Sequence, residues 1–172
     1  PGAAARIGRI ALMGGAVAEG NVTPAAEFNI WCDPEAARRV FESGLDVTMV
    51  GLDVTHAARV NPSHHEALRA AGPAGALVVE LLEFYGGFHK RIYGWDGSPI
   101  HDALTLAHVI APGLLRTERL HVAVETESQL CRGRTVVDRW RRTGLAPNAS
   151  VAIEVPDPEA FPQLLIDRLG RL

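Results

Sequence analysis

The sequence has few cysteines and no long apolar run, and both shortages exclude classes of protein. Cys32 and Cys131 are its only cysteines, and they lie about a hundred positions apart, in neither a metal-ligand nor a redox spacing. In a reducing compartment we expect both to be small buried hydrophobic residues. The longest apolar run, around residues 75–82, is far shorter than the roughly 20 residues of a membrane span. No basic-then-apolar leader opens the chain, so a cytoplasmic protein without a membrane partner is expected.

The sequence also lacks a large excess of charge of either sign. Lys and Arg number 17 against 20 Asp and Glu, for a net charge of −3, and the basic residues do not gather into a stripe. A nucleic-acid partner is therefore not expected. At 172 residues, with 47% hydrophobic and 22% charged residues, the composition is typical of one soluble globular domain.

The first third of the chain predicts a parallel α/β arrangement. Residues 7–13 form a short apolar run before two glycines, which is typical of a strand buried on both faces. A loop is expected to continue to about Cys32. Asp33-Pro34-Glu35 then predicts the start of a helix that ends before Gly44, and residues 46–52 predict a second strand. A strand, a helix and a strand in this order indicate a right-handed crossover and a parallel pair.

The rest of the chain continues the alternation. Helices are expected over residues 63–71 and 76–91, the second broken at Gly86-Gly87. Ser98-Pro99 predicts an N-cap and first turn of a helix that ends before Pro112 and is apolar on nearly all sides, hence buried. Residues 121–125, 135–140 and 151–155 predict strands, and residues 158–172 predict an amphipathic terminal helix.

The densest group of polar side chains follows the first predicted strand. Its members are Glu19, Asn21, Thr23, Glu27 and Asn29. Ligands of open α/β sheets bind at the carboxyl ends of strands, and carboxylates and amides there could bind the vicinal hydroxyls of a sugar. The alternative is a surface loop with local bonds from side chain to backbone.

Histidines mark two further places. His101-Asp102 falls in the first turn of an apolar helix, where the helix dipole lowers the pKa of the ring and the carboxylate raises it, and we expect the two effects to leave a ring that can donate or accept a proton. The alternative is a capped helix with a satisfied histidine. His64-His65 lacks the i, i+4 spacing of a zinc helix and is expected on a solvated face.

Three residues after the second strand also have two interpretations. Asp53, Thr55 and His56 could touch a ligand. Because Asx and hydroxyl side chains also shape turns, we prefer a structural role for them.

Five segments together resemble the inosine-uridine preferring nucleoside hydrolase family, in order and at similar spacings. They are residues 13–15 (MGG), 20–30 (GNVTPAAEFNI), 33–37 (DPEAA), 51–56 (GLDVTH) and 99–103 (PIHDA). The resemblance implies an open, mostly parallel sheet with flanking helices. It also implies hydrolysis of the N-glycosidic bond of ribonucleosides, through an oxocarbenium-like transition state, with a calcium ion that activates water and holds the ribose diol.

The matching positions then acquire implied roles. The ribose hydroxyls would be bound by Asn21, Glu27 and Asn29. Met13 would line the sugar pocket. His101 would protonate the departing base as a general acid, a contribution of about 10² to 10⁴ in rate. Asp102 would be a calcium ligand.

The sequence departs from the family in lacking its opening Asp-x-Asp-x-Gly-x-Asp-Asp motif. We therefore expect residues 1–172 to be a single incomplete domain, the carboxyl-terminal part of a hydrolase whose amino-terminal half is missing. Calcium would be bound in the complete enzyme but not tightly by this chain, because a calcium ion is coordinated by about six to eight oxygens. The isolated chain is expected to be inactive, and to be a homo-oligomer or to depend on the missing half. The alternative is a non-catalytic remnant that binds ribosides or serves in assembly. The preferred base is not readable.

Overall fold

The structure is a computed structural model that describes residues 6–172. The chain forms two compact units, of which the first comprises residues 1–54 with 115–154 and the second residues 55–114 with 155–172. That the chain is one incomplete domain stays a prediction. Among the described residues, no helix has the length and apolar character needed to cross a membrane.

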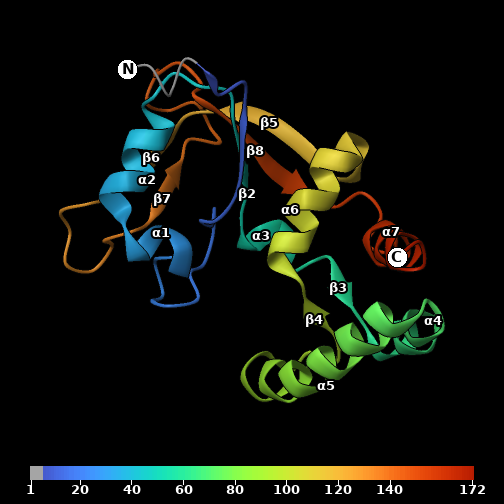
Figure 1. Ribbon diagram of the computed structural model, residues 1–172. Coiled ribbons are helices and arrows are strands. Elements are labelled where there is room, and N and C mark those ends of the chain that lie inside the picture. Colours follow the sequence, from blue (N-terminus) through green and yellow to red (C-terminus); the bar gives the residue numbers. More distant parts are fainter. Residues whose placement is uncertain (1–5) are drawn as a thin grey trace. The chain divides into compact units, whose positions relative to one another are not determined.

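The first unit is built on a four-stranded sheet in the order β1-β2-β8-β5 (Figure 1). Its strands are β1 (Ile10–Met13), β2 (Val47–Val50), β8 (Ala149–Glu154) and β5 (Arg116–Leu120). β1 pairs with β2 and β2 with β8 in parallel, whereas β5 runs antiparallel to β8. The predicted α/β fold with a mostly parallel sheet is thus confirmed.

Helix α2 (Pro34–Phe41) connects the two parallel strands β1 and β2. The Asp33 carboxylate caps it by accepting a hydrogen bond from the Ala36 N–H at 2.9 Å, and Pro34 opens its first turn, as the sequence predicted. Phe41 is 2% exposed and packs in one core cluster with Met49 and Val151. A two-stranded sheet of β6 (Val122–Val124) and β7 (Thr135–Val137) completes the unit, and α2 packs on β6.

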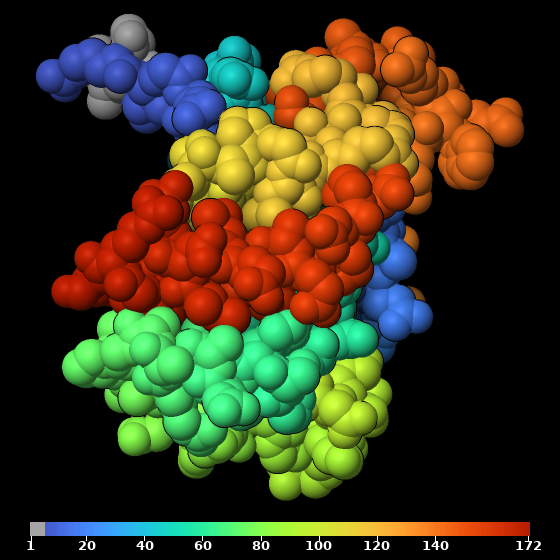
Figure 2. Space-filling model, turned by 90° about the vertical axis from the view of Figure 1, so that its right-hand side faces the viewer, coloured from blue at the N-terminus to red at the C-terminus, as the bar shows by residue number. Residues whose placement is uncertain are grey.

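The second unit is mainly helical. It contains β3 (Arg59–Val60) paired with β4 (Ser98–Pro99), then α4 (His65–Ala70), α5 (Pro73–Tyr93), α6 (His101–Ile110) and α7 (Ala160–Leu169). The 3-10 turns η2 (Pro62–His64) and η3 (Pro112–Leu114) join these elements, and the short helix α3 (Leu52–Thr55) leads in from β2. Figure 2 shows the red α7 lying between the green α4 and the yellow α6, both of which it contacts.

Three predictions in the first unit were wrong in part. The strand expected over residues 7–13 begins at Ile10 and pairs on one side only, and its Ala11 is exposed instead of buried. The loop expected to reach Cys32 contains the helix α1 (Phe28–Cys32). Strand β5 was not predicted, because its sequence, RTERL, is mostly polar and three of its side chains are exposed.

In the second unit, the predicted break in α5, the predicted N-cap of α6 and the predicted burial of α6 were wrong. Helix α5 runs unbroken through Gly86-Gly87, since each interior glycine costs only about 1 kcal/mol. Ser98 lies in β4 and does not cap α6, whose N-cap is Ile100. Helix α6 is not buried on all sides, because Leu106 is 61% exposed.

The prediction that the two cysteines are buried was also wrong. Both lie in the first unit, where Cys32 is exposed and Cys131 is half-buried.

Candidate functional site

The loop after β1 is held by the buried carboxylate of Glu27. Glu27 is 2% exposed and is the N-cap of α1. Its oxygens accept hydrogen bonds from the backbone N–H groups of Gly15 at 2.9 Å, Asn29 at 2.9 Å and Ile30 at 3.2 Å. A buried carboxylate needs such donors to replace its lost hydration. Glu27 therefore fixes the distance between the end of β1 and the start of α1.

Two more side chains, one from strand β7 and one from helix α3, bind the same loop. The Thr135 hydroxyl accepts from the Ala16 N–H at 2.9 Å and donates to the Ala16 carbonyl at 2.7 Å. The Asp53 carboxylate accepts from Val17 N–H at 2.6 Å and from Ala18 N–H at 3.0 Å. The preferred structural interpretation of Asp53 agrees with these contacts. Sequence reasoning missed Thr135, because nothing in its neighbourhood signals a partner 119 positions away.

Gly15 lies where the structure has no space for a side chain. Its φ is +75°, and a Cβ would come within 2.7 Å of Met49 Cε and 2.8 Å of Thr135. A left-handed backbone and a close approach both favour glycine. The turn behind β1 is thus set by the backbone and by the three side chains that bind it.

The predicted sugar-binding residues in this unit lie together, but much of their hydrogen-bonding capacity is used locally. The Asn29 side-chain amide donates to the Met13 carbonyl at 3.2 Å and lies 3.2 Å from Met13 Sδ. Asn21 Oδ1 accepts from the Phe28 N–H at 2.9 Å. Among residues 6–172 no further bond uses Asn21 Nδ2 or Asn29 Oδ1, so these two atoms remain for a ligand.

In the second unit, His101 is held from one side. It lies in the first turn of α6, as predicted, and its Nδ1 is 2.8 Å from the Thr55 hydroxyl oxygen. Thr55 is 1% exposed, so this anchor is fixed in the protein interior. Because Nδ1 is engaged, Nε2 is the ring atom left to meet a ligand.

The electrostatics of His101 differ from the prediction. Burial lowers the pKa of His101 to about 4, with the nearby rings of His56 and His89 acting in the same direction, while Asp102 raises it by less. The sequence suggested a balance between a dipole and a carboxylate, but desolvation is the largest cause. At neutral pH the ring is uncharged.

Aromatic rings and imidazoles surround His101. The His56 ring lies 5.6 Å from His101 and 4.8 Å from Trp95, centroid to centroid. Tyr93 stacks on Trp95 at 4.4 Å. His89 contacts both of these rings and its Nδ1 bonds the Ser98 hydroxyl at 2.9 Å. The sequence drew attention to His56 and to His101 separately but did not join them, because they lie 45 positions apart.

A cavity of about 530 Å³ opens beside His101, between α5 and α6. Leu81, Tyr85, Phe88 and His89 form its α5 wall, and Ile100 to Ala103 form the opposite side. An apolar, aromatic-walled cavity with a few polar groups is the usual form of a site for a flat organic ligand. His101 is therefore placed to touch such a ligand.

Comparison with known proteins decides which family this is. The model of the inosine-uridine preferring nucleoside hydrolase family matches residues 1–163. The chain belongs to this family. The predicted resemblance, made on five short segments, is confirmed.

Nucleoside hydrolases from several organisms are similar to the chain. It is 47% identical over 168 residues to the pyrimidine-specific ribonucleoside hydrolase RihA of Klebsiella pneumoniae, covering 96% of this chain and 54% of that protein. It is 49% identical over 166 residues to RihA of Escherichia coli, covering 95% and 53%. The chain spans about half the length of these curated relatives.

Solved nucleoside hydrolase structures share the fold. A purine-preferring ribonucleoside hydrolase from Gardnerella vaginalis superposes with a TM-score of 0.84 at 33% identity, covering 96% of this chain and 52% of that one. A plant nucleoside hydrolase gives 0.86 at 31% identity, covering 98% and 55%.

The residues present do not make a calcium site by themselves. Within residues 6–172 no group of three His, Cys, Asp or Glu side chains could hold a metal ion. Asp102 is exposed on the first turn of α6, and one carboxylate offers two oxygens where calcium takes six to eight.

The paired histidines of η2 and α4 have structural roles. His64 was expected on a solvated face, but it is 6% exposed, accepts from the Asn61 N–H at 2.9 Å and bonds the Glu159 carboxylate at 2.8 Å. These bonds fasten η2 to the segment before α7. His65 lies by Glu83.

Proposed function

We propose that this chain forms the carboxyl-terminal part of a ribonucleoside hydrolase, which cleaves the N-glycosidic bond to release base and ribose. The observation that carries the proposal is the ring of His101, held at Nδ1 by Thr55 and lining an aromatic cavity of about 530 Å³. A flat nucleobase fits such walls, and the reaction needs a hydrogen-bond or proton donor at the departing base.

In this proposal His101 acts on the leaving base. With a pKa of about 4, the free ring holds little of the extra proton at neutral pH. A base that accepts a hydrogen bond from the ring favours its protonated form, so the bound substrate would raise the pKa toward the working range of a general acid. His101 could also act without being protonated, because the N–H of a neutral imidazole can donate a hydrogen bond that polarises the substrate, as it does in other enzymes.

Four residues between β1 and α1 are assigned to the ribose. Asn21 and Glu27 lie in the loop after β1 and Asn29 in the first turn of α1, with Met13 beside Asn29. The free amide atoms of Asn21 and Asn29 would meet the sugar hydroxyls directly. Glu27 would offer the lone pairs that its three backbone bonds leave. Asp102 would supply one oxygen to a calcium ion whose other ligands lie outside this chain.

We propose pyrimidine ribonucleosides as substrates. The RihA proteins, named for that specificity, are 47–49% identical to this chain, whereas the purine-preferring enzyme is 33% identical.

The sharpest test replaces the matching part of Escherichia coli RihA by this chain. We expect the chimera to release ribose from uridine faster than from inosine. His101→Ala in the chimera should lower turnover of uridine by about 10² or more, with a smaller loss on a nitrophenyl riboside, whose leaving group needs no proton. His121→Ala is the matched control, because its ring bonds the Ala146 carbonyl and lines no part of the cavity beside His101.

Equal losses on the two leaving groups would contradict the role of His101. A folded chimera, checked by circular dichroism, that hydrolyses neither nucleoside would contradict the proposed function. The chain alone, with calcium, is expected to release no ribose, and turnover that a chelator abolishes would show that it needs no further segment.

A further inference from the structure

The loop of residues 138–147, which connects β7 to β8 in the first unit, carries three exposed arginines. They are Arg139, Arg141 and Arg142. None of the three makes an ion pair with another residue among those described, 6–172. Exposed arginines alone are usually solvated charges, so the place of each side chain decides whether it has a further role.

One of these side chains, Arg141, lines a cavity of about 330 Å³ in the first unit. Arg119 of β5 and His121 line the same cavity, together with Asp138 and residues 144–147. Two guanidinium groups and an imidazole on one cavity make a basic site. A cavity of this size holds a small organic ligand or an ion.

The carboxylate among the lining residues is bound by its own loop. Asp138 accepts hydrogen bonds from the Arg142 N–H at 2.8 Å, the Thr143 N–H at 2.8 Å and the Thr143 hydroxyl at 2.6 Å. These bonds, that of the hydroxyl first, lower the pKa of Asp138. The carboxylate is thus ionised at neutral pH, but donors of the loop offset its charge. Asp138 therefore shapes the basic site.

Arg119 and His121 are held in place by main-chain carbonyl groups. Arg119 Nη2 donates to the Pro147 carbonyl at 3.3 Å, and its Nη1 lies 3.8 Å from Asp46 Oδ1. His121 Nδ1 donates to the Ala146 carbonyl at 3.0 Å. Because a carbonyl only accepts, the proton of the neutral ring is on Nδ1, and Nε2 is left as an acceptor. An anion that itself carries a proton, as phosphate does, satisfies this nitrogen better than a carboxylate does.

The backbone of Arg141 is strained. Its φ is +52°, and among residues 6–172 only glycines share this sign of φ. A Cβ makes the left-handed conformation unfavourable, whereas glycine adopts it freely, as Gly144 does at φ +70° in the same loop. The chain thus keeps an arginine where the backbone favours glycine. Such strain is concentrated at sites where a side chain has a function.

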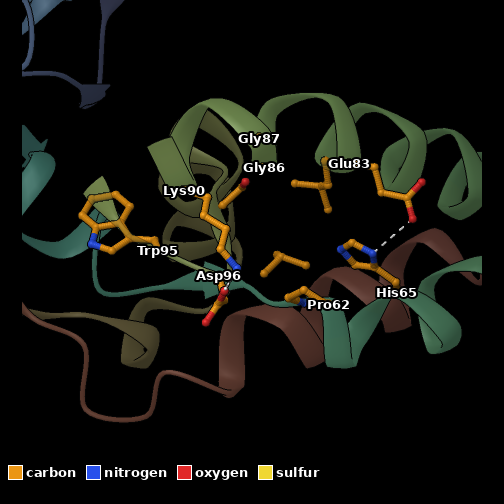
Figure 3. A pocket seen from close by; sticks show the side chains of 11 residues that line it. Pro62, His65, Glu83, Gly86, Gly87, Lys90, Trp95 and Asp96 are labelled. Atoms are coloured by element: carbon orange, nitrogen blue, oxygen red, sulfur yellow. Dashed lines mark hydrogen bonds and ion pairs between the residues drawn. The ribbon is translucent and has the colours of Figure 1, made fainter. Parts of the chain in front are cut away.

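A cavity in the second unit, beside α5, shows the contrast. It has a volume of about 380 Å³ and is also lined by charged residues. Figure 3 shows its Lys90 against Asp96 and its His65 against Glu83, at 2.8 Å and 3.6 Å. An anion there would have to displace a carboxylate from Lys90. At Arg141 no carboxylate has to be displaced.

We propose that the cavity lined by Arg119, His121 and Arg141 binds a phosphate group, either of inorganic phosphate or of a phosphate monoester. The two guanidinium groups donate to its oxygens, since their planar fork fits phosphate with paired hydrogen bonds. His121 Nε2 accepts from the protonated oxygen. The site uses no residue assigned to the ribose or to the base, so it is separate from the proposed hydrolase site.

The test is isothermal titration calorimetry of the 172-residue chain with sodium phosphate, at an ionic strength held constant with sodium chloride. We expect saturable binding of one phosphate with a Kd of about 1 mM or tighter. Arg119→Gln and Arg141→Gln should each weaken binding by about tenfold or more, because each removes hydrogen bonds between charged groups. Arg142→Gln is the matched control. It removes the same charge from the same loop, but Arg142 does not line the cavity, so the Kd should change by less than about twofold.

Arg141→Gly separates loss of the ligand contact from loss of the fold. Because glycine adopts a positive φ without strain, this variant should keep or raise the urea midpoint of unfolding and still lose phosphate binding.

Ribose 5-phosphate is the probe that distinguishes the two sources of the phosphate group. Tighter binding than that of inorganic phosphate assigns the cavity to a monoester, and equal or weaker binding assigns it to the free ion. In either case the amide NMR signals of Gly144 and Leu145 should shift on addition of phosphate. Absence of saturable phosphate binding would overturn the inference. So would equal losses in Arg141→Gln and Arg142→Gln, which would mean diffuse attraction to the loop, or signal shifts that leave residues 138–147 unaffected.

Discussion

In the loop after β1, the buried carboxylate of Glu27 accepts hydrogen bonds from three backbone N–H groups. Beside the aromatic cavity, the imidazole of His101 is also largely buried, but one hydroxyl is its bonded neighbour and its other edge lines a cavity. Both residues belong to segments that identify the family. Their surroundings differ, because backbone N–H groups occupy most of the acceptor positions of the Glu27 carboxylate, whereas one edge of the His101 ring faces a cavity.

Short segments typical of the family therefore contain both residues that hold the backbone in place and residues placed to contact a ligand. A carboxylate that accepts several backbone hydrogen bonds mainly holds its loop in place, whereas a desolvated ring that lines a cavity has a displaced pKa and an edge that can contact a ligand. The two kinds of residue should therefore respond to substitution in different ways, the first mainly in stability and the second mainly in titration and ligand contact.

The largest effect is expected from Glu27→Ala. Removing the carboxylate leaves the N–H groups of Gly15, Asn29 and Ile30 without their acceptor, and each buried donor so stranded costs about 1–3 kcal/mol. We expect the free energy of unfolding, measured with urea, to fall by about 3–5 kcal/mol. Glu19→Ala is the control, since Glu19 is exposed in the same loop and should change the value by less than about 0.5 kcal/mol. A similar small loss for both would show that Glu27 does not hold the loop.

A smaller loss is expected from Thr135→Val. Valine keeps the shape of threonine but loses the hydroxyl that both accepts from and donates to the backbone of Ala16. Two buried backbone groups lose their partner, so unfolding should become easier by about 2 kcal/mol. Thr117→Val, at an exposed position of β5, should be close to neutral. Equal stability of the Thr135 variant and the natural chain would mean that water or another group replaces the hydroxyl.

The sequence predicted more of the fold than of the site. The strand before Gly14, the capped helix at Asp33 and the parallel pairing depend on local patterns within about forty residues, and these were confirmed. The partnership of Thr55 with His101, 46 positions apart, has no such local pattern. Strand β5 was missed for the same reason, because a polar sequence becomes a strand only when β8 offers its edge.

The pKa of His101 predicts a pH-dependent stability. Its folded pKa, about 4, lies below the ordinary 6.5, so the unfolded chain binds this proton first as the pH falls. Stability from the neutral ring is then fully present above about pH 6.5 and is lost as the pH falls toward 4, by at most a tenfold change in the unfolding constant per pH unit. Urea unfolding at pH 7 and pH 5 should show a larger loss for the natural chain than for His101→Asn, which cannot titrate. Equal losses would place the ring in water.

The smallest effect is expected from Thr55→Val, and it separates positioning from packing. Valine fills the space of threonine, so stability should change by only about 1 kcal/mol, but Nδ1 of His101 loses the oxygen 2.8 Å away. We expect the ring ¹⁵N resonances of His101 to shift and its titration midpoint to move, because the hydroxyl bonds one protonation state in preference to another. Thr55→Ser keeps a hydroxyl and should restore the natural spectrum despite its smaller side chain. A serine variant that resembled valine would mean that the methyl group, and not the hydroxyl, places the ring. Unchanged His101 resonances in Thr55→Val would mean that α6 alone orients it, and the contrast between a saturated loop and an anchored ring would then rest on Glu27 only.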